Sequence, residues 1–165
     1  MTVQYDHVLL MGPMYHLLEE VNRVRAVISA INLLKPGGII FVSFISTCAG
    51  ITYYLKTEPE LIISSNPTEM EYREAFLSRK SFGGDGFTRA FFIELSEIIP
   101  FMVRFPLEKL HLFGQEGLLS LGEKNVMSQP QEVIDGWLDF CEKLWDRDEF
   151  LSWAEHPMYV GRKIS

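Results

Sequence analysis

The stretch that decides the fold runs from Tyr5 to Ser46 and reads YDHVLLMGPMYHLLEEVNRVRAVISAINLLKPGGIIFVSFIS. It opens on an apolar run, residues 8–11, which is long enough for a strand buried on both faces. A turn at Gly12-Pro13 ends this run, because proline cannot donate to a strand ladder and glycine relaxes the backbone. A second run, residues 39–45, is rich in β-branched and aromatic side chains and predicts a second buried strand.

The segment between these two runs predicts a helix over residues 19–34. A cation, a proline and two glycines in Lys35-Pro36-Gly37-Gly38 predict its end. Two strands joined through a helix form a right-handed βαβ unit with parallel strands, so the sequence predicts an α/β fold. The apolar residues of the helix recur at helical spacing: Val21, Val24, Val27, Ile28, Ile31 and Leu34.

The same residues resemble a known family. The run Tyr5-Asp6-x-Val8-Leu9-x-Met11-Gly12-Pro13-Met14-Tyr15-His16-Leu17, followed by Arg23 and by Leu34-Lys35-Pro36-Gly37-Gly38, resembles the fourth through fifth strands of class I S-adenosylmethionine-dependent methyltransferases. The closest branch is the small-molecule, methyltransferase-like one. The resemblance implies a Rossmann-like sheet with helices on both faces, parallel strands and a C-terminal antiparallel strand.

The family also has a part that this chain lacks. Its members open with a strand that runs into a glycine-rich turn around the cofactor, and an acidic residue after the next strand holds the ribose. Only four residues precede Tyr5, and the later Gly83-Gly84-Asp85-Gly86 follows a polar segment, so we interpret that run as a loop. We therefore expect residues 1–165 to form a single, truncated methyltransferase domain whose N-terminal strands are missing.

The middle of the chain is less regular. Residues 56–86 are expected to form an insertion over the cleft or, alternatively, a variable surface excursion. Within it, Asn66 or Thr68 is expected to cap a helix that ends at Leu77, with Met70 among its inward residues. Small and polar residues, 46–50, are interpreted as an approach to the cleft, with a short helix at 51–55.

The last third alternates helices and strands. We predict a helix over residues 95–104, a strand over 107–114 and a short helix over 118–121. A helix beginning at Pro130 follows, and a strand over 157–163 ends the chain. The long helix carries an apolar stripe, including Trp137 and Trp145, that is expected to face the core. The last two strands, with a helix between them, resemble the reversed sixth and seventh strands of the family.

Composition limits the partners. The 165 residues carry a net charge of −7, which argues against a nucleic-acid partner. No signal peptide and no uninterrupted apolar run of membrane-spanning length is visible, so no membrane is expected. The two cysteines, Cys48 and Cys141, form no Cys-x-x-Cys and are typical of a reducing, cytoplasmic protein. The four histidines share no metal-ligand spacing, so no metal is expected.

Ligands of open α/β sheets lie beyond the carboxyl ends of the strands. The resemblance implies that Met11, Gly12 and Pro13 lie along the cofactor, S-adenosylmethionine, and that Tyr15 and His16 face the substrate. His16 could act as a base, since its ordinary pKa is near neutral, or it could merely hydrogen-bond a loop. Tyr15 could form a pocket wall or act as an acid.

Other candidates follow later strands. Ser46 and Thr47, after the second strand, are predicted substrate contacts, and Glu116 is predicted to line the pocket or to form an ordinary turn. His156 is interpreted as part of a turn, and His7 and His111 as sheet or surface residues. No Gly-x-Ser-x-Gly elbow is present, which disfavours a serine hydrolase.

Two hypotheses follow from the sequence. The first is an S-adenosylmethionine-dependent methyltransferase that acts on a small molecule. The alternative is a catalytically silent, truncated remnant that forms a homodimer. In that case the strand at residues 8–11 is an edge without a proline or lysine guard, and such an edge invites pairing with a second copy.

Overall fold

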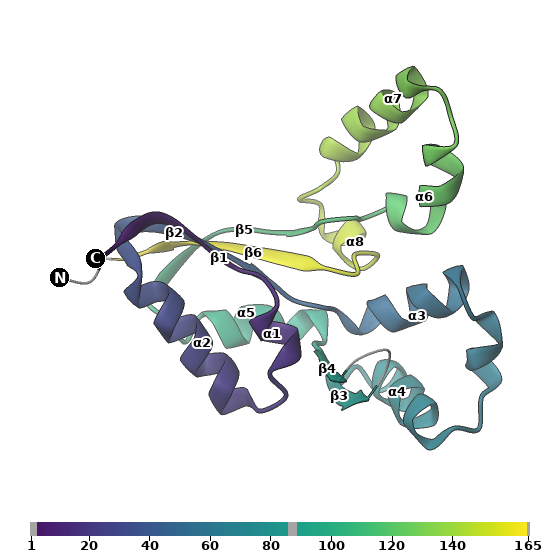
Figure 1. The fold of residues 1–165 in the computed structure, drawn as a ribbon, viewed down its shortest axis with the longest axis horizontal. Helices are drawn as coiled ribbons and strands as arrows, with labels where there is room; N and C mark the ends of the chain where they lie inside the picture. The colour runs from purple at the N-terminus through teal and green to yellow at the C-terminus, as the bar shows by residue number, and fades with distance from the viewer. Residues whose placement is uncertain (1–2, 86–88, 165) are drawn as a thin grey trace.

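The computed structural model describes residues 3–85 and 89–164, and these residues form an α/β protein around a four-stranded mixed sheet (Figure 1). A separate two-stranded sheet lies beside it. The elements follow one another as β1 (Tyr5–Leu10), α1 (Pro13–His16), α2 (Glu20–Asn32), β2 (Leu34–Ser43), α3 (Thr47–Lys56), the 3-10 helix η1 (Pro59–Ile63), α4 (Pro67–Leu77), β3 (Phe82–Asp85), β4 (Arg89–Phe92), α5 (Leu95–Met102), β5 (Leu107–Gly114), α6 (Leu119–Met127), α7 (Gln131–Glu142), α8 (Asp148–Leu151) and β6 (Pro157–Lys163).

The main sheet has the strand order β1-β2-β6-β5. The β1 and β2 strands pair in parallel and are joined through α2, which confirms the predicted strand–helix–strand unit. The prediction that the first strand is buried on both faces is wrong, because Leu9 is 66% exposed. The last strand, β6, runs antiparallel to both of its neighbours, β2 and β5. Within the described residues β1 lies at the edge of the sheet, as the sequence predicted.

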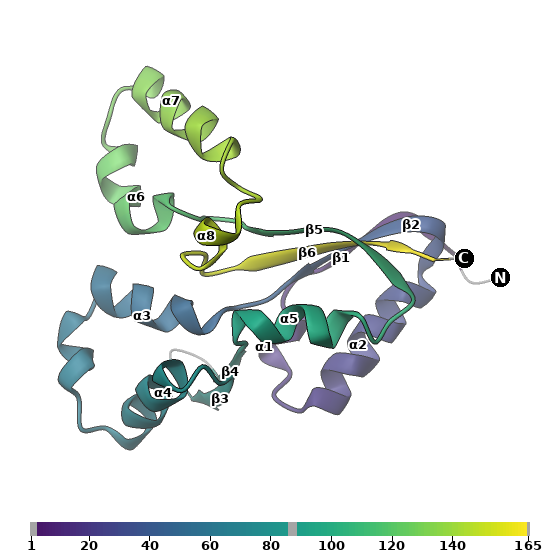
Figure 2. The ribbon, with the colours of Figure 1, turned by 180° about the vertical axis from the view of Figure 1, so that it is seen from behind.

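The core lies between one face of this sheet and the helices α2 and α5. Along β2, Ile40 and Val42 point to that face and are fully buried, because alternate residues of a strand share a face. Val27 of α2 and Ile98 of α5 meet them in the same cluster. Figures 1 and 2 show both helices on this face, and the short helix α8 lies beside β5.

The predicted stop of the first long helix is part of a strand. Helix α2 ends at Asn32, and Leu34 already pairs with Tyr5 at the start of β2. The register then shifts, since the next pair is His7 with Ile39. The extra residues form an irregular start to β2, where Gly37 takes a φ of 76° that side chains rarely adopt. The predicted helix end at residue 34 is therefore two residues too late, and Lys35-Pro36-Gly37-Gly38 lies inside the strand rather than at the end of the helix.

The segment from α3 to β4 folds around its own aromatic cluster, made of Tyr54, Tyr72 and Phe82. The Tyr72 and Phe82 rings meet edge to face, with centroids 5.2 Å apart. The interpretation of residues 83–86 as a loop is wrong for the described part, because residues 83–85 belong to β3, which pairs with β4. Gly86 itself lies outside the described residues.

The helices of this segment correct the sequence reading in two places. Helix α4 begins after Asn66, whose side chain accepts from the Thr68 backbone N–H at 2.9 Å, so the predicted cap is confirmed. Met70, predicted to face inward, is exposed, and Tyr72 takes the buried position instead. Residues 46–50, interpreted as an approach to the cleft, form the start of α3 with Ser46 as its cap.

The two helices between β5 and α8 also differ from the prediction. Helix α6 extends to Met127 rather than ending at Leu121. Helix α7 forms where Pro130 predicted it, but it has no buried residue, and Trp137 is 40% exposed. Figures 1 and 2 show that α6 and α7 project beyond the end of the sheet, so the stripe of α7 does not reach the core. Of the helices formed by the described residues, none has the length and apolarity to cross a membrane.

Candidate functional site

The directions of the strands gather several segments at one edge of the main sheet. This edge is formed by the ends of the strands and is distinct from the side of the sheet that the outer strand β1 forms. The parallel strands β1 and β2 both end at this edge. Because β6 is antiparallel to β2, β6 begins there, and β5 ends there for the same reason. The segments that meet at this edge are residues 11–16, 43–47, 114–116 and 155–157.

The turn after β1 presents two side chains at this edge. Gly12 takes a φ of 109°, and its carbonyl accepts hydrogen bonds from the backbone N–H groups of Tyr15 and His16 at 3.1 and 3.0 Å. Met14 is buried and anchors this short helix in the core. The Tyr15 and His16 rings lie with centroids 4.8 Å apart. The sequence predicted both residues at the site; they are neighbours in the chain, and their rings also lie close together in the structure.

A second histidine faces the same tyrosine. The Nδ1 atom of His156 lies 2.5 Å from Oε1 of Glu116, and the backbone N–H of His156 donates to Oε2 of Glu116 at 3.0 Å. The ring centroids of Tyr15 and His156 are 6.2 Å apart, edge to face. Because Glu116 engages Nδ1, the ring presents Nε2 as the nitrogen that can meet a ligand.

Both members of this pair titrate away from their ordinary values. Burial raises the pKa of Glu116, but the hydrogen bonds from the His156 ring and backbone outweigh burial, and the pKa is lowered. The hydrogen bond to Glu116 raises the pKa of His156 against the opposing effect of burial, and the charge of Glu155 adds to the rise. The site therefore favours a carboxylate beside an imidazolium.

Neighbouring contacts fix the segment that carries His156. Glu155 pairs with Lys56 of α3, with Nζ and Oε1 2.9 Å apart, and accepts a hydrogen bond from Ser120 of α6. On the other side, the side chain of Gln115 donates to the Ser43 hydroxyl at 2.9 Å and joins the ends of β5 and β2. The Gln115 backbone N–H also donates to the His156 carbonyl at 3.1 Å, so the His156 segment is held both at Glu155 and by Gln115.

Ser46 and Thr47, the predicted substrate contacts, have buried side chains. The Ser46 hydroxyl donates to the Ala154 carbonyl at 2.8 Å and accepts from the Cys48 N–H at 3.1 Å. The Thr47 hydroxyl donates to Glu94 at 3.3 Å. Both hydroxyls thus hold the start of α3 in place, and neither side chain is presented at the surface of the site.

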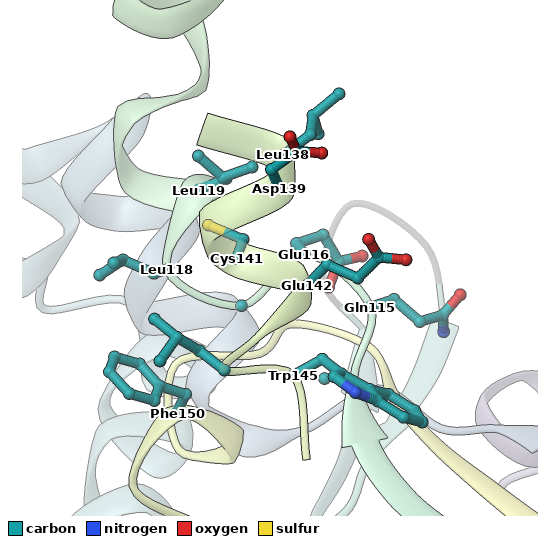
Figure 3. A pocket seen from close by; sticks show the side chains of 13 residues that line it. Gln115, Glu116, Leu118, Leu119, Leu138, Asp139, Cys141, Glu142, Trp145 and Phe150 are labelled. Carbon is teal, nitrogen blue, oxygen red and sulfur yellow. The ribbon is translucent and has the colours of Figure 1, made fainter. Parts of the chain in front are cut away.

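A cavity of about 350 Å³ opens beside this edge, where β5 leaves the sheet (Figure 3). Its lining comes from the end of β5 and from α6, α7 and the segment up to α8. Gln115 and Glu116 are among the lining residues, so the cavity and the His156 pair share the Glu116 side chain. The described residues contain no group of His, Cys, Asp and Glu side chains able to hold a metal ion.

The sequence analysis did not predict His156 as a residue of this site, because its position before the last strand indicates a turn. Its position depends on the pairing of β5 with β6, which sets Gly114 opposite Pro157. A sequence signal did exist: a histidine directly before the last strand and a glutamate two residues after the end of the preceding one. A hairpin of those strands would place the two side by side. The chain matches no model of a known protein family and no curated protein.

Proposed function

We propose that the chain is an S-adenosylmethionine-dependent methyltransferase that acts on a small molecule by direct methyl transfer. The observation that carries the proposal is the sheet edge, where the Gly12 turn after β1 lies beside the Tyr15 and His156 rings. In open α/β sheets, ligands bind beyond the carboxyl ends of the strands. A parallel pair joined through a helix, with a last strand of opposite direction, is also what the family resemblance implies.

The turn after β1 fits the methionine end of the cofactor. Met11 is half exposed, and a Cβ on Gly12 would meet only the His16 ring, at 3.9 Å, so the backbone here is open to a ligand. The described residues offer no glycine-rich turn between a strand and a helix for the rest of the cofactor. When bound, the cofactor supplies a methyl group on a positively charged sulfur.

The residues around the turn supply orientation and a proton acceptor. We assign the acceptor role to His156 rather than to His16, because Glu116 fixes the His156 ring and raises its pKa. Tyr15 lies between the two histidines and forms a wall of the site. A cytoplasmic location agrees with the free thiols of Cys48 and Cys141.

The proposal is tested by titrating S-adenosylmethionine into the chain with calorimetry and with amide NMR. We expect heat of binding and shifts in the amides of Met11, Gly12 and Tyr15. The amide of Ile63, in η1 and away from this edge, serves as an internal control and should not move. Absence of heat at millimolar cofactor, together with unmoved amides after β1, would count decisively against the assignment.

A second candidate function is a catalytically silent remnant that dimerises through β1. The observation in its favour is that β1 lies at the edge of the described sheet, with Leu9 66% exposed and Tyr5 half exposed. This candidate predicts a dimer in light scattering and no binding of the cofactor. A monomer at tens of micromolar contradicts it, whereas cofactor binding favours the enzyme.

A further inference from the structure

The cavity beside Glu116 has the size and walls of a small-molecule site. Its volume of about 350 Å³ lies within the range of roughly 300–1,000 Å³ that is typical of ligand pockets. Figure 3 shows side chains from the residues after β5 and from α6, α7 and α8 arranged around it. Four apolar side chains that form much of its wall are Leu138, Leu144, Trp145 and Phe150.

The Trp145 ring is held by its neighbours. It meets the Phe113 ring edge to face with centroids 4.5 Å apart, and the His111 ring lies 5.3 Å away on the same strand. Trp145 therefore offers a fixed aromatic surface rather than a free side chain. Such a surface packs against an apolar body, and the face of an indole also attracts a cation.

The charges of the cavity have one sign. Three carboxylates line it, those of Glu116, Asp139 and Glu142, and none of the 13 lining residues is a lysine, arginine or histidine. Glu116 is already paired with His156, but no ion pair to Asp139 or Glu142 is found within the described part of the chain. Low-dielectric walls concentrate the field of such charges, which favours a cation and disfavours an anion.

We propose that this cavity binds the methyl acceptor, and that the acceptor is an amine carried on an apolar, preferably aromatic, body. The role as acceptor rests on the function proposed above, whereas binding of the amine does not. Since Glu116 belongs both to the cavity and to the pair with His156, an ammonium group beside Glu116 lies next to the proposed proton acceptor.

Methyl transfer to the amine moves one proton and one methyl group. At a pH above its raised pKa, the His156 ring is neutral and takes one proton from the ammonium group, which frees the nitrogen lone pair. That lone pair forms the new nitrogen–carbon bond to the methyl group, while the carbon–sulfur bond breaks. The sulfur keeps the bonding electron pair and becomes a neutral thioether, and the nitrogen carries the positive charge.

Three probes of one skeleton test the charge preference: 3-phenylpropylamine, 3-phenylpropanol and 3-phenylpropionate. Each is titrated into the full chain at low salt without cofactor, and binding is read by calorimetry and by tryptophan fluorescence. We expect the amine to bind about tenfold or more tightly than the carboxylate, with the alcohol between them. Equal affinity for all three would overturn the amine assignment, and no binding of any would overturn the site.

Variants on α7 test whether the carboxylates of the cavity cause the preference for the amine. Glu142→Gln and Asp139→Asn should each weaken amine binding by about three- to tenfold and leave alcohol binding unchanged. Glu132→Gln, on the same exposed helix but outside the cavity lining, is the matched control and should change neither. An equal loss in the control would contradict a specific role for the two cavity carboxylates.

The outcome is separable from that of the proposed function. Amine binding without any binding of S-adenosylmethionine would keep the cavity as a ligand site and reject the methyltransferase. Cofactor binding without a preference for the amine would keep the enzyme and reject the acceptor class. Formation of N-methylated probe, detected by mass spectrometry when both are present, would support the two together.

Discussion

The pair of Glu116 and His156 ties a single hydrogen bond to a measurable titration. The carboxylate raises the pKa of His156, so Glu116→Gln should lower the His156 pKa toward the ordinary value of 6.5. Ring-proton NMR across a pH series measures this directly. Glu132→Gln removes a carboxylate far from the ring and should leave the titration in place. An unchanged His156 pKa in Glu116→Gln would show that the pair does not form in solution.

The same pair predicts how stability depends on pH. The pKa of Glu116 is lowered in the folded state. Its contribution to the free energy of unfolding is therefore present above pH 4.5 and is lost as the pH falls through the folded pKa. The pKa of His156 is raised in the folded state. Its contribution to the free energy of unfolding is therefore present below pH 6.5 and is lost as the pH rises through the folded pKa. In urea denaturation, the unfolding free energy of Glu116→Gln should therefore fall furthest below that of the wild type between pH 4.5 and pH 6.5. A deficit that is constant with pH would contradict this.

Two glycines should respond to alanine in opposite directions. Gly12 has a φ of 109°, so Gly12→Ala should cost about 1–3 kcal/mol of unfolding free energy through backbone strain. Gly136 lies inside α7, where an added Cβ meets nothing within 4 Å. Gly136→Ala should therefore raise stability by up to about 1 kcal/mol, because alanine is the better helix former. Urea denaturation measures both, and equal signs would refute the comparison.

At the scale of elements, two helix caps of different burial can be compared. Ser46 caps α3 and also donates to the buried Ala154 carbonyl, so Ser46→Ala should cost about 2–3 kcal/mol. Asn66 caps α4 at the surface, and Asn66→Ala should cost about 1 kcal/mol. Chemical denaturation of both variants gives the difference. Equal losses would mean that the bond to Ala154 contributes nothing measurable.

Local patterns predicted the elements that depend on neighbours in sequence. The strand–helix–strand unit of residues 5–43 and the cap at Asn66 follow from apolar spacing and capping chemistry, both of which act over a few residues. Helix α7 was predicted for the same reason, but its apolar stripe does not reveal which surface it meets. Strand β3 was missed because two glycines occupy it and only its pairing with β4 makes it a strand.

At the scale of the whole molecule, the sequence predicts a residue of the candidate site only when that residue follows the end of a single strand. Tyr15 and Glu116 each follow a strand, so strand ends alone pointed to them. Their meeting with His156 depends on β6 lying between β2 and β5, and Glu116 and His156 are 40 residues apart. The cavity likewise needs α6, α7 and α8 in place together. Tertiary packing of this kind leaves no periodic trace in the sequence.

The exposed edge of the sheet gives a prediction for the whole molecule. Leu9 pairs with Phe41 on the face opposite α2 and is 66% exposed on the edge strand β1. The second candidate function requires the chain to self-associate at tens of micromolar, because an unguarded apolar edge pairs readily with another copy. Leu9→Lys should shift the mass in light scattering to the monomer, while unfolding free energy changes by less than about 0.5 kcal/mol.

Ile63→Lys is the matched control for this edge. Ile63 is 83% exposed at the end of η1, which lies away from β1, so the same new charge should leave the association unchanged. A wild-type chain that is monomeric at these concentrations would refute association through β1. If both lysine variants dissociate the chain equally, the association does not depend specifically on β1, because of these two residues only Leu9 lies on the edge strand.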